Sequence, residues 1–224
     1  MTGIGITALT ISTSVSGGAP NAAAATTQTV QDTFIPQDCL TWKNRLVTYN
    51  KNQLFISEFN QPEYWPSNAD ITIPNGNAIK AIAVVGFSTD FNTDEKLIVF
   101  TESTMYQVTG TGIFDSNSGL YDYVLDFIDY VGCPSSNLAV RAFGSLFWIT
   151  YRGVYMFSGA GKPVRISRGI ESYFAADGNF NKGKIHLGFG TYFQKANKIH
   201  WVVSDKVLGE NKAILSLDLR LTLS

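Results

Sequence analysis

Charge is what this sequence has least of. Charged residues make up 16% of its 224 residues, whereas about a quarter is usual in soluble domains. The formal net charge is −1, and no block of Lys and Arg occurs, so nothing indicates binding to nucleic-acid phosphates. The surface must instead be built largely from Ser, Thr, Asn and Gln. This favours a subunit that covers much of its surface with neighbours over a freely diffusing enzyme.

Long apolar runs and cysteines are also scarce. No apolar run approaches the ~18 residues of a transmembrane helix, so we predict no membrane-spanning segment. The first residues are mildly apolar but have no Lys or Arg before the apolar part, which does not favour a signal peptide. The two cysteines, Cys39 and Cys133, lie far apart without CxxC spacing. We interpret them as two buried thiols, with a disulfide or a metal role as the open alternatives.

Recognisable catalytic and ligand-binding motifs are missing. The sequence contains no phosphate-binding P-loop, no dinucleotide fingerprint and no G-x-S-x-G elbow. His186 and His200 lie in strand-like runs without a partner at metal-ligand spacing, so we interpret both as packing or surface residues. Asp90, Asn92 and Asp94 resemble the start of a calcium loop but lack its Gly and its final Glu, which favours a solvated loop. We therefore predict no enzyme and assign no catalytic, cofactor-binding or metal-binding residues.

Three carboxylates keep one enzymatic alternative open. Glycan-cleaving enzymes use a pair of carboxylates, and Asp122, Asp126 and Asp129 are close in sequence. The first two share a face if this run is a strand, and the last two approach each other if it is a helix. The Asp-box of sialidases, S-x-D-x-G-x-x-W, is absent from the hairpins.

A proline-bracketed loop is the candidate binding feature. Residues 58–66 read EFNQPEYWP, with two prolines around Glu63, Tyr64 and Trp65. Prolines cannot extend a central strand. We favour a rigid loop whose Trp packs on a sheet edge; the alternative is an exposed aromatic anchor for a partner or a sugar.

Strand signals fill most of the chain. Short runs rich in Val, Ile, Thr, Tyr, Phe and Trp are punctuated by Gly, Asn, Asp and Ser, which predicts an all-β protein. The best short helix candidate is 124–132, and alternation fits part of that run equally well. Residues 1–33 read differently, as a strand over 4–12 followed by an extended arm of small uncharged residues over 13–31. We predict the compact domain over 34–224.

Four similar hairpins recur along this domain, near 44–59, 95–110, 144–159 and 197–219. Their first apolar residues, Leu46, Leu97, Leu146 and Ile199, are separated by 51, 49 and 53 positions. A further strand precedes each of the last three, over 78–89, 135–144 and 184–194. A repeat of roughly 50 residues with about four strands is typical of a β-propeller blade. We predict a propeller-like array of about four blades, complete or part of a larger one, with a β-sandwich as the alternative.

The third hairpin, GSLFWITYRGVYMFSG (144–159), shows how such a unit would be built. We predict that Arg152 and Gly153 form its turn. Trp148, Tyr151, Tyr155 and Phe157 are interpreted as packing residues between blades rather than as an aromatic site.

Several of these stretches resemble a known family. WKNRLVTYNKNQLFISEFNQPEYWP (42–66) is similar to the opening blade of the tail hub or nozzle proteins of short-tailed bacteriophages: an Asn-Arg, an apolar strand, a turn, an aromatic strand ending in Ser, then a Pro and a Trp. KLIVFTESTMYQVTG (96–110) and GSLFWITYRGVYMFSGAGKPVRISRGIESYF (144–174) resemble later hairpins of that family. SLDLR (216–220) resembles its Tyr-Asp-Leu-Arg strand, with Leu217 in the place of Tyr.

The resemblance implies a structural role in the virion. Copies of the chain would form a ring, often sixfold in the family, that extends the tail below the portal and adaptor proteins. Genome DNA would pass through the lumen during ejection without specific binding, and no enzyme residues carry over. The alternative hypothesis is a carbohydrate-binding or glycan-cleaving propeller used in host recognition.

Overall fold

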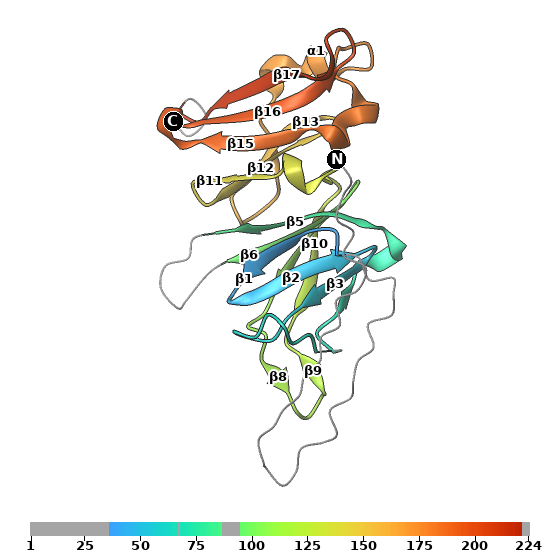
Figure 1. The fold of residues 1–224 in the computed structure, drawn as a ribbon, viewed down its shortest axis with the longest axis vertical. Coiled ribbons are helices and arrows are strands. Elements are labelled where there is room, and N and C mark those ends of the chain that lie inside the picture. Colours follow the sequence, from blue (N-terminus) through green and yellow to red (C-terminus); the bar gives the residue numbers. More distant parts are fainter. Residues whose placement is uncertain (1–35, 67, 87–94, 221–224) are drawn as a thin grey trace, which may run out of the picture.

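The computed structural model describes residues 36–66, 68–86 and 95–220, and over these it is an all-β protein (Figure 1). The predicted arm over 1–33 and the calcium-like positions 90, 92 and 94 lie outside the described residues. Within the described part, no helix combines the length and the apolar character needed to cross a bilayer.

Four antiparallel sheets follow one another along the chain, and each is a simple meander. Sheet 1 contains β1 (Cys39–Trp42), β2 (Arg45–Asn50), β3 (Gln53–Ile56) and β4 (Ile71–Thr72) in that order. Sheet 2 contains β5 (Ile79–Val85), β6 (Lys96–Thr101), β7 (Met105–Thr109) and β10 (Val124–Asp129). Sheet 3 contains β11 (Val140–Ala142), β12 (Ser145–Thr150), β13 (Gly153–Phe157) and β14 (Val164–Arg165). Sheet 4 contains β15 (Phe189–Phe193), β16 (Lys198–Asp205) and β17 (Gly209–Asp218).

The remaining elements are short connections. A small hairpin, β8 (Phe114–Asp115) and β9 (Leu120–Tyr121), is inserted between β7 and β10. The helix α1 covers Glu171–Phe174. Single 3-10 segments lie at Pro74–Gly76, Ser136–Leu138, Arg168–Ile170, Lys182–Leu187 and Gln194–Ala196.

The four predicted hairpins are present as pairs of adjacent antiparallel strands. They are β2 with β3, β6 with β7, β12 with β13, and β16 with β17. The turn prediction in the third hairpin is shifted by one residue, because Tyr151 and Arg152 form the turn and Gly153 begins β13. Gly153 has φ +140° and lies so close to the Ser167 hydroxyl that a Cβ would collide with it. Only glycine fits this position without strain.

Two other predictions are corrected. The best helix candidate, 124–132, contains the strand β10, because its partner β7 supplies hydrogen bonds along nearly its whole length. The β-sandwich alternative fails because the chain forms four sheets stacked in series instead of two facing layers (Figure 1).

The sheets stack face to face and bury two hydrophobic clusters. One lies between sheets 1 and 2, and the larger one joins sheets 2, 3 and 4. Strand β6 contributes side chains to both clusters. Leu97 and Val99 belong to the first cluster, and Ile98 and Phe100 belong to the second. Successive residues of a strand face opposite sides, so a strand covered on both sides needs the continuous apolar run found here. The first strands also lie next to one another, since β1 contacts β5, β5 contacts β11 and β11 contacts β15.

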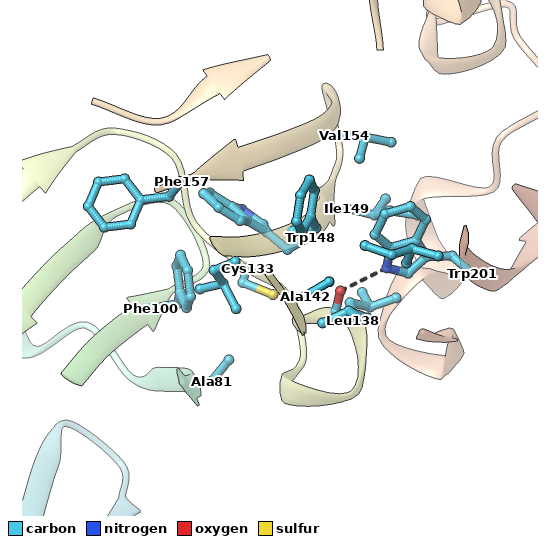
Figure 2. Packing of buried hydrophobic residues seen from close by; sticks show 14 of the residues in the cluster. Ala81, Phe100, Cys133, Leu138, Ala142, Trp148, Ile149, Val154, Phe157 and Trp201 are labelled. Carbon is cyan, nitrogen blue, oxygen red and sulfur yellow. Dashed lines mark hydrogen bonds between the residues drawn. The ribbon is translucent and has the colours of Figure 1, made fainter. Parts of the chain in front are cut away.

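Three buried tryptophans each donate a hydrogen bond to a backbone carbonyl outside their own sheet. Trp42 donates its indole N–H to Glu95 O just before β6, at 3.1 Å. Trp148 of sheet 3 donates to Gly132 O in the connection from sheet 2, at 3.1 Å. Trp201 of sheet 4 donates to Leu138 O just before β11, at 3.0 Å, as Figure 2 shows. Each interface between sheets therefore combines a large apolar side chain with one directional hydrogen bond.

The stack is open at its ends. Sheets 1 and 4 lie at opposite ends of the molecule (Figure 1), so the described array does not close on itself. Each of these end sheets therefore has one face in the stack and one face turned away from it.

The cysteine prediction is half right. Cys133 is completely buried beside Phe100 and Trp148 (Figure 2), and its thiol donates to Ser135 O at 3.1 Å. Cys39 is exposed on β1, and both thiols are free. The prediction of a buried thiol is therefore wrong for Cys39, because its side chain points away from the core on which Leu40 and Trp42 pack.

Candidate interaction surface

The β8–β9 hairpin and the loop after β3 meet at one end of the molecule, where they build the most elaborate polar cluster of the described residues. Arg45 at the start of β2 is only 5% exposed. Its Nη1 donates to Ser57 O and to Glu58 Oε1, each at 3.0 Å, and its Nη2 donates to Gly112 O at 2.7 Å. The hydroxyl of Tyr121 on β9 donates to Glu58 Oε2 at 2.6 Å. Arg45 and Glu58 thus tie sheet 1 to the segment that carries the hairpin.

Aromatic rings pack beneath this ion pair. Tyr121 stacks on Tyr123 with ring centroids 5.8 Å apart and planes 12° apart, and Trp42 lies 5.9 Å from Tyr123. Gly112 is required here, because a Cβ would lie 2.6 Å from the Tyr123 hydroxyl and 2.7 Å from Arg45 Nε. Burial raises the pKa of Tyr123 to about 12, so the phenol stays neutral.

The ion pair also sets the charge of Glu58. Partial burial by itself would raise the pKa of this carboxyl, but the hydrogen bonds from Tyr121, the Phe59 amide and Arg45, with the positive charge of Arg45, lower it below the usual value. Glu58 is therefore a charged structural partner at neutral pH and is poorly suited to act as a general acid.

The three candidate carboxylates serve separate local roles. Asp122 accepts hydrogen bonds from the amides of Thr111, Gly112 and Ile113 and from the Thr111 hydroxyl. Although burial acts to raise its pKa, these bonds lower it below the usual value, and both of its oxygens are occupied.

The other two carboxylates lie on β10. Asp126 lies opposite Gln107 and accepts from its side chain at 3.4 Å, whereas Asp129 accepts from the Tyr130 amide at 2.7 Å. The three side chains thus have different partners, and no hydrogen bond among the described residues joins them into a pair.

Exposed apolar side chains surround the polar cluster. Ile113 is 67% exposed, Leu120 58%, Phe59 and Tyr64 49% each, and Phe114 47%. We call these five residues the tip surface. The loop after β3 is closed by Glu58 N, which donates to Tyr64 O at 2.9 Å, and is tied to the β8–β9 turn by Asn68 Nδ2, which donates to Gly119 O at 2.9 Å. The Phe59 ring lies 5.8 Å from the Arg45 guanidinium carbon, and Phe114 lies 5.3 Å from Tyr121.

A second apolar group follows the outer edge of sheet 2. Phe127 is 48% exposed and Tyr130 74%. Phe127 lies 4.8 Å from Tyr130 and 5.7 Å from Tyr106, so its ring is positioned by neighbours rather than free. Grouped exposed apolar residues of this kind mark surfaces that contact another molecule more often than single ones do.

For the loop over 58–66, the packing of the tryptophan on a sheet edge stays a prediction, and the aromatic residues of the loop differ in exposure. Trp65 is partly buried, whereas Tyr64 is exposed. Phe59, which the sequence argument did not single out, joins Tyr64 on the tip surface. Its position three residues after β3, inside a polar stretch, is the signal that could have found it.

The two histidines lie in different surroundings. His186 lies exposed in a 3-10 segment and not in a strand, whereas His200 is half-buried on β16 between Thr191 and Ser216. Among the described residues, no three His, Cys, Asp or Glu side chains gather as a metal site would require.

A shallow hollow lies between the turns of the second and third hairpins. Its lining includes Lys80, Glu102 and Tyr151. Tyr151 donates to Glu102 Oε1 at 2.8 Å, and burial together with this carboxylate raises the pKa of Tyr151 to about 12. Tyr151 and Glu102 therefore bind each other at the rim of this hollow.

No protein-family model matches the chain, and no curated protein sequence matches it.

Proposed function

We propose that this chain is a structural subunit of a bacteriophage tail, of the nozzle or hub type. In this proposal, copies of the chain assemble into a ring in the virion, for example a hexamer, that extends the tail and forms a conduit for DNA. The portal, the adaptor and other tail proteins are its neighbours. The sequence resemblance over residues 42–66, 96–110 and 144–174 suggests the family.

The observation that carries the proposal is the apolar surface of the described chain. The tip surface and the edge of sheet 2 expose aromatic and aliphatic side chains at positions that neighbouring groups hold in place. Only 16% of the residues are charged, so electrostatic repulsion between the apolar surfaces of two copies is weak. A subunit whose surfaces are covered by neighbours would have both properties.

We further propose that the four sheets are blades of a propeller-like array. The adjacency of β1, β5, β11 and β15 supports this, because the first strands of successive blades line the axis of a propeller. The free faces of sheets 1 and 4 would then meet further blades or neighbouring subunits.

The conduit role agrees with the charge of the chain. With a net charge of −1 and no basic block, a ring of these chains would not hold the phosphate backbone through released counterions. DNA would pass without specific binding. The occupied oxygens of Asp122 and the separate partners of Asp126 and Asp129 support a non-enzymatic role.

The test is assembly of the purified full chain, followed by sedimentation velocity and electron microscopy. We expect rings of several copies. The double variant Phe114→Ser, Leu120→Ser should raise the dissociation constant at least about tenfold, since two apolar anchors are removed. The matched control is Val164→Ser, which changes an equally exposed residue on β14 outside the tip surface.

A different result would favour the carbohydrate alternative. A chain that stays monomeric at every concentration and binds or cleaves bacterial surface glycans would refute the tail proposal. Loss of glycan binding in Tyr64→Ala would then assign the tip surface to sugar contacts, since exposed aromatic rings serve that purpose as well.

A further inference from the structure

The charges of this chain are divided unevenly between its two halves. Residues 36–139, which include sheets 1 and 2 and the β8–β9 hairpin, contain 12 Asp and Glu but only 5 Lys and Arg. Residues 140–220, which include sheets 3 and 4, contain 5 Asp and Glu but 12 Lys and Arg. The small net charge of the whole chain therefore conceals an acidic half of −7 and a basic half of +7. An asymmetry of this size indicates a charged partner.

The folded chain keeps the two groups of charges apart. The sheets stack in series, with sheets 1 and 4 at opposite ends of the molecule (Figure 1). Stacked sheets lie about 10 Å apart, so the middles of the two halves are separated by roughly 20 Å, more than twice the Debye length of about 8 Å in physiological salt. Among the described residues a single ion pair, Arg141 with Glu95, joins the halves. The molecule therefore has an acidic end and a basic end.

The acidic end carries the tip surface. Glu63 lies in the loop 58–66 and Asp115 lies on β8, and both residues are exposed. Residues 57–70 and 111–122, which hold all five side chains of the tip surface, contain five Asp and Glu and no Lys or Arg. The exposed apolar side chains of the tip surface therefore lie among carboxylates.

The outer face of sheet 4 lies at the basic end and is partly apolar. Phe189 of β15, Val202 of β16 and Ile214 of β17 lie opposite one another in a row across the sheet. Phe189 is 48% exposed and Ile214 66%, and Phe193 at the other end of β15 is 51% exposed. Apolar side chains grouped on an exposed face in this way mark a surface that contacts another molecule.

Positive charge lies beside this apolar face. Lys195 is two positions after Phe193, Lys212 is two positions before Ile214, and both lysines are exposed. Residues 182–212 contain six Lys and only two Asp and Glu. Each end of the molecule therefore combines exposed apolar side chains with nearby charges, and the charges at the two ends have opposite signs.

We propose that copies of this chain associate head to tail, with the tip surface of one copy on the outer face of sheet 4 of the next. Opposite charges around the two apolar surfaces set the orientation, because they attract unlike ends and repel like ends. A contact between two different surfaces repeats from copy to copy, and it closes into a ring when the rotation allows. The inference rests on the proposed self-assembly and names the contact that builds the ring, whatever the role of the ring in a tail.

Sedimentation velocity of the purified full chain at a series of salt concentrations tests the electrostatic part of the contact. Salt screens the attraction between exposed opposite charges, so association should weaken as salt is added. We expect the dissociation constant to rise at least about tenfold between about 0.05 M and about 0.5 M NaCl. A dissociation constant that stays unchanged or falls overturns the proposal.

Two charge-reversed variants test which ends meet. Gln61→Lys with Glu63→Lys makes the tip more positive, and Lys195→Glu with Lys212→Glu makes the outer face of sheet 4 more negative. Each variant alone should associate at least about tenfold more weakly than the wild type, because its two ends are no longer oppositely charged. An equal mixture of the two variants should assemble again, because every end then finds a partner of opposite sign.

A matched control reverses charges outside both surfaces. Lys51→Glu with Lys80→Glu makes the same two changes as the sheet 4 variant, on exposed lysines in the β2–β3 turn and on β5. This control should keep the dissociation constant within about threefold of the wild-type value, since neither lysine belongs to the contact.

The outcomes separate this contact from the proposed ring. Rings that form equally well in the wild type and in both charge-reversed variants overturn the head-to-tail contact and leave the ring intact. Open filaments that salt and each variant disrupt support the contact and refute the ring. A mixture of the two variants that does not assemble overturns the proposal. So does a monomeric chain that binds a labelled DNA duplex through Lys195 and Lys212, which assigns the basic end to nucleic acid.

Discussion

Replacing each of the three interface tryptophans by phenylalanine should weaken the stack at a different place. Trp42, Trp148 and Trp201 are each at most 1% exposed, and each donates its indole N–H to a carbonyl outside its own sheet. Phenylalanine retains most of the apolar contact but leaves the carbonyl without this donor, in a buried site for Trp148 and Trp201 and in a partly buried one for Trp42. An unsatisfied buried group costs about 1–3 kcal/mol, and the smaller ring adds a cavity to this loss.

The assay is denaturant or thermal unfolding of each single variant. For a chain of this size, about 1 kcal/mol shifts the unfolding temperature by roughly 2–4 °C, so each Trp→Phe change should lower it by about 2–12 °C. Trp148→Ala should cost more, about 3–5 kcal/mol, because it also removes the ring contact with Phe100.

The matched control is Trp65→Phe. Trp65 is partly exposed in the loop after β3, so this change should stay within about 0.5 kcal/mol. Additivity of Trp42→Phe and Trp201→Phe is also expected, since these residues lie in separate clusters. If Trp148→Phe were no more destabilising than Trp65→Phe, the indole hydrogen bonds would not hold the sheets together as argued.

Three further outcomes are expected. The pKa of Glu58 is lowered in the folded chain, so the ionised carboxylate stabilises the fold. The free energy of unfolding of the wild type should exceed that of Glu58→Gln by its full amount above the ordinary glutamate pKa of 4.5, and the difference should vanish as the pH falls through the pKa of the folded chain. Urea unfolding at a series of pH values measures this difference. Cys39 should react with a thiol reagent in the native chain, whereas Cys133, whose pKa burial raises to about 12, should react only on unfolding; equal rates would contradict the burial of Cys133. Gly153→Ala should lower the free energy of unfolding by at least about 1 kcal/mol, since alanine is strained at φ +140°; calorimetry showing no change would refute the steric argument.

The local units of the fold could be predicted from the sequence because their signals are local. Alternating apolar residues and polar turns marked the four central hairpins, and their spacing near 50 residues marked the repeat. Errors arose where the local signal was ambiguous. The run containing β10 fits either period, and its pairing with β7 decided the outcome. Cys39 was assigned to the interior because nothing in its neighbours shows which face of β1 is covered.

The contacts of the polar cluster could not be predicted from the sequence. Glu58 and Tyr121 are 63 positions apart, and Arg45 and Gly112 are 67 positions apart. No residue spacing predicts such contacts, since they depend on how β8 and β9 lie against sheet 1. The same holds for Phe59, whose exposure follows from the packing of Arg45 and Glu58 beneath it.

By itself the sequence determined the all-β character, the strand pairs of the central hairpins and their repetition, because hydrogen bonding to an adjacent strand and side-chain alternation act over a few residues. Only the tertiary structure decided that the sheets stack in series and that Trp42, Trp148 and Trp201 each donate a hydrogen bond outside their own sheet. The physical reason is that the hydrophobic effect is non-directional, so burying a given apolar area stabilises the fold by the same free energy whichever faces meet. Which faces meet is settled by shape and by directional hydrogen bonds between residues far apart in the chain.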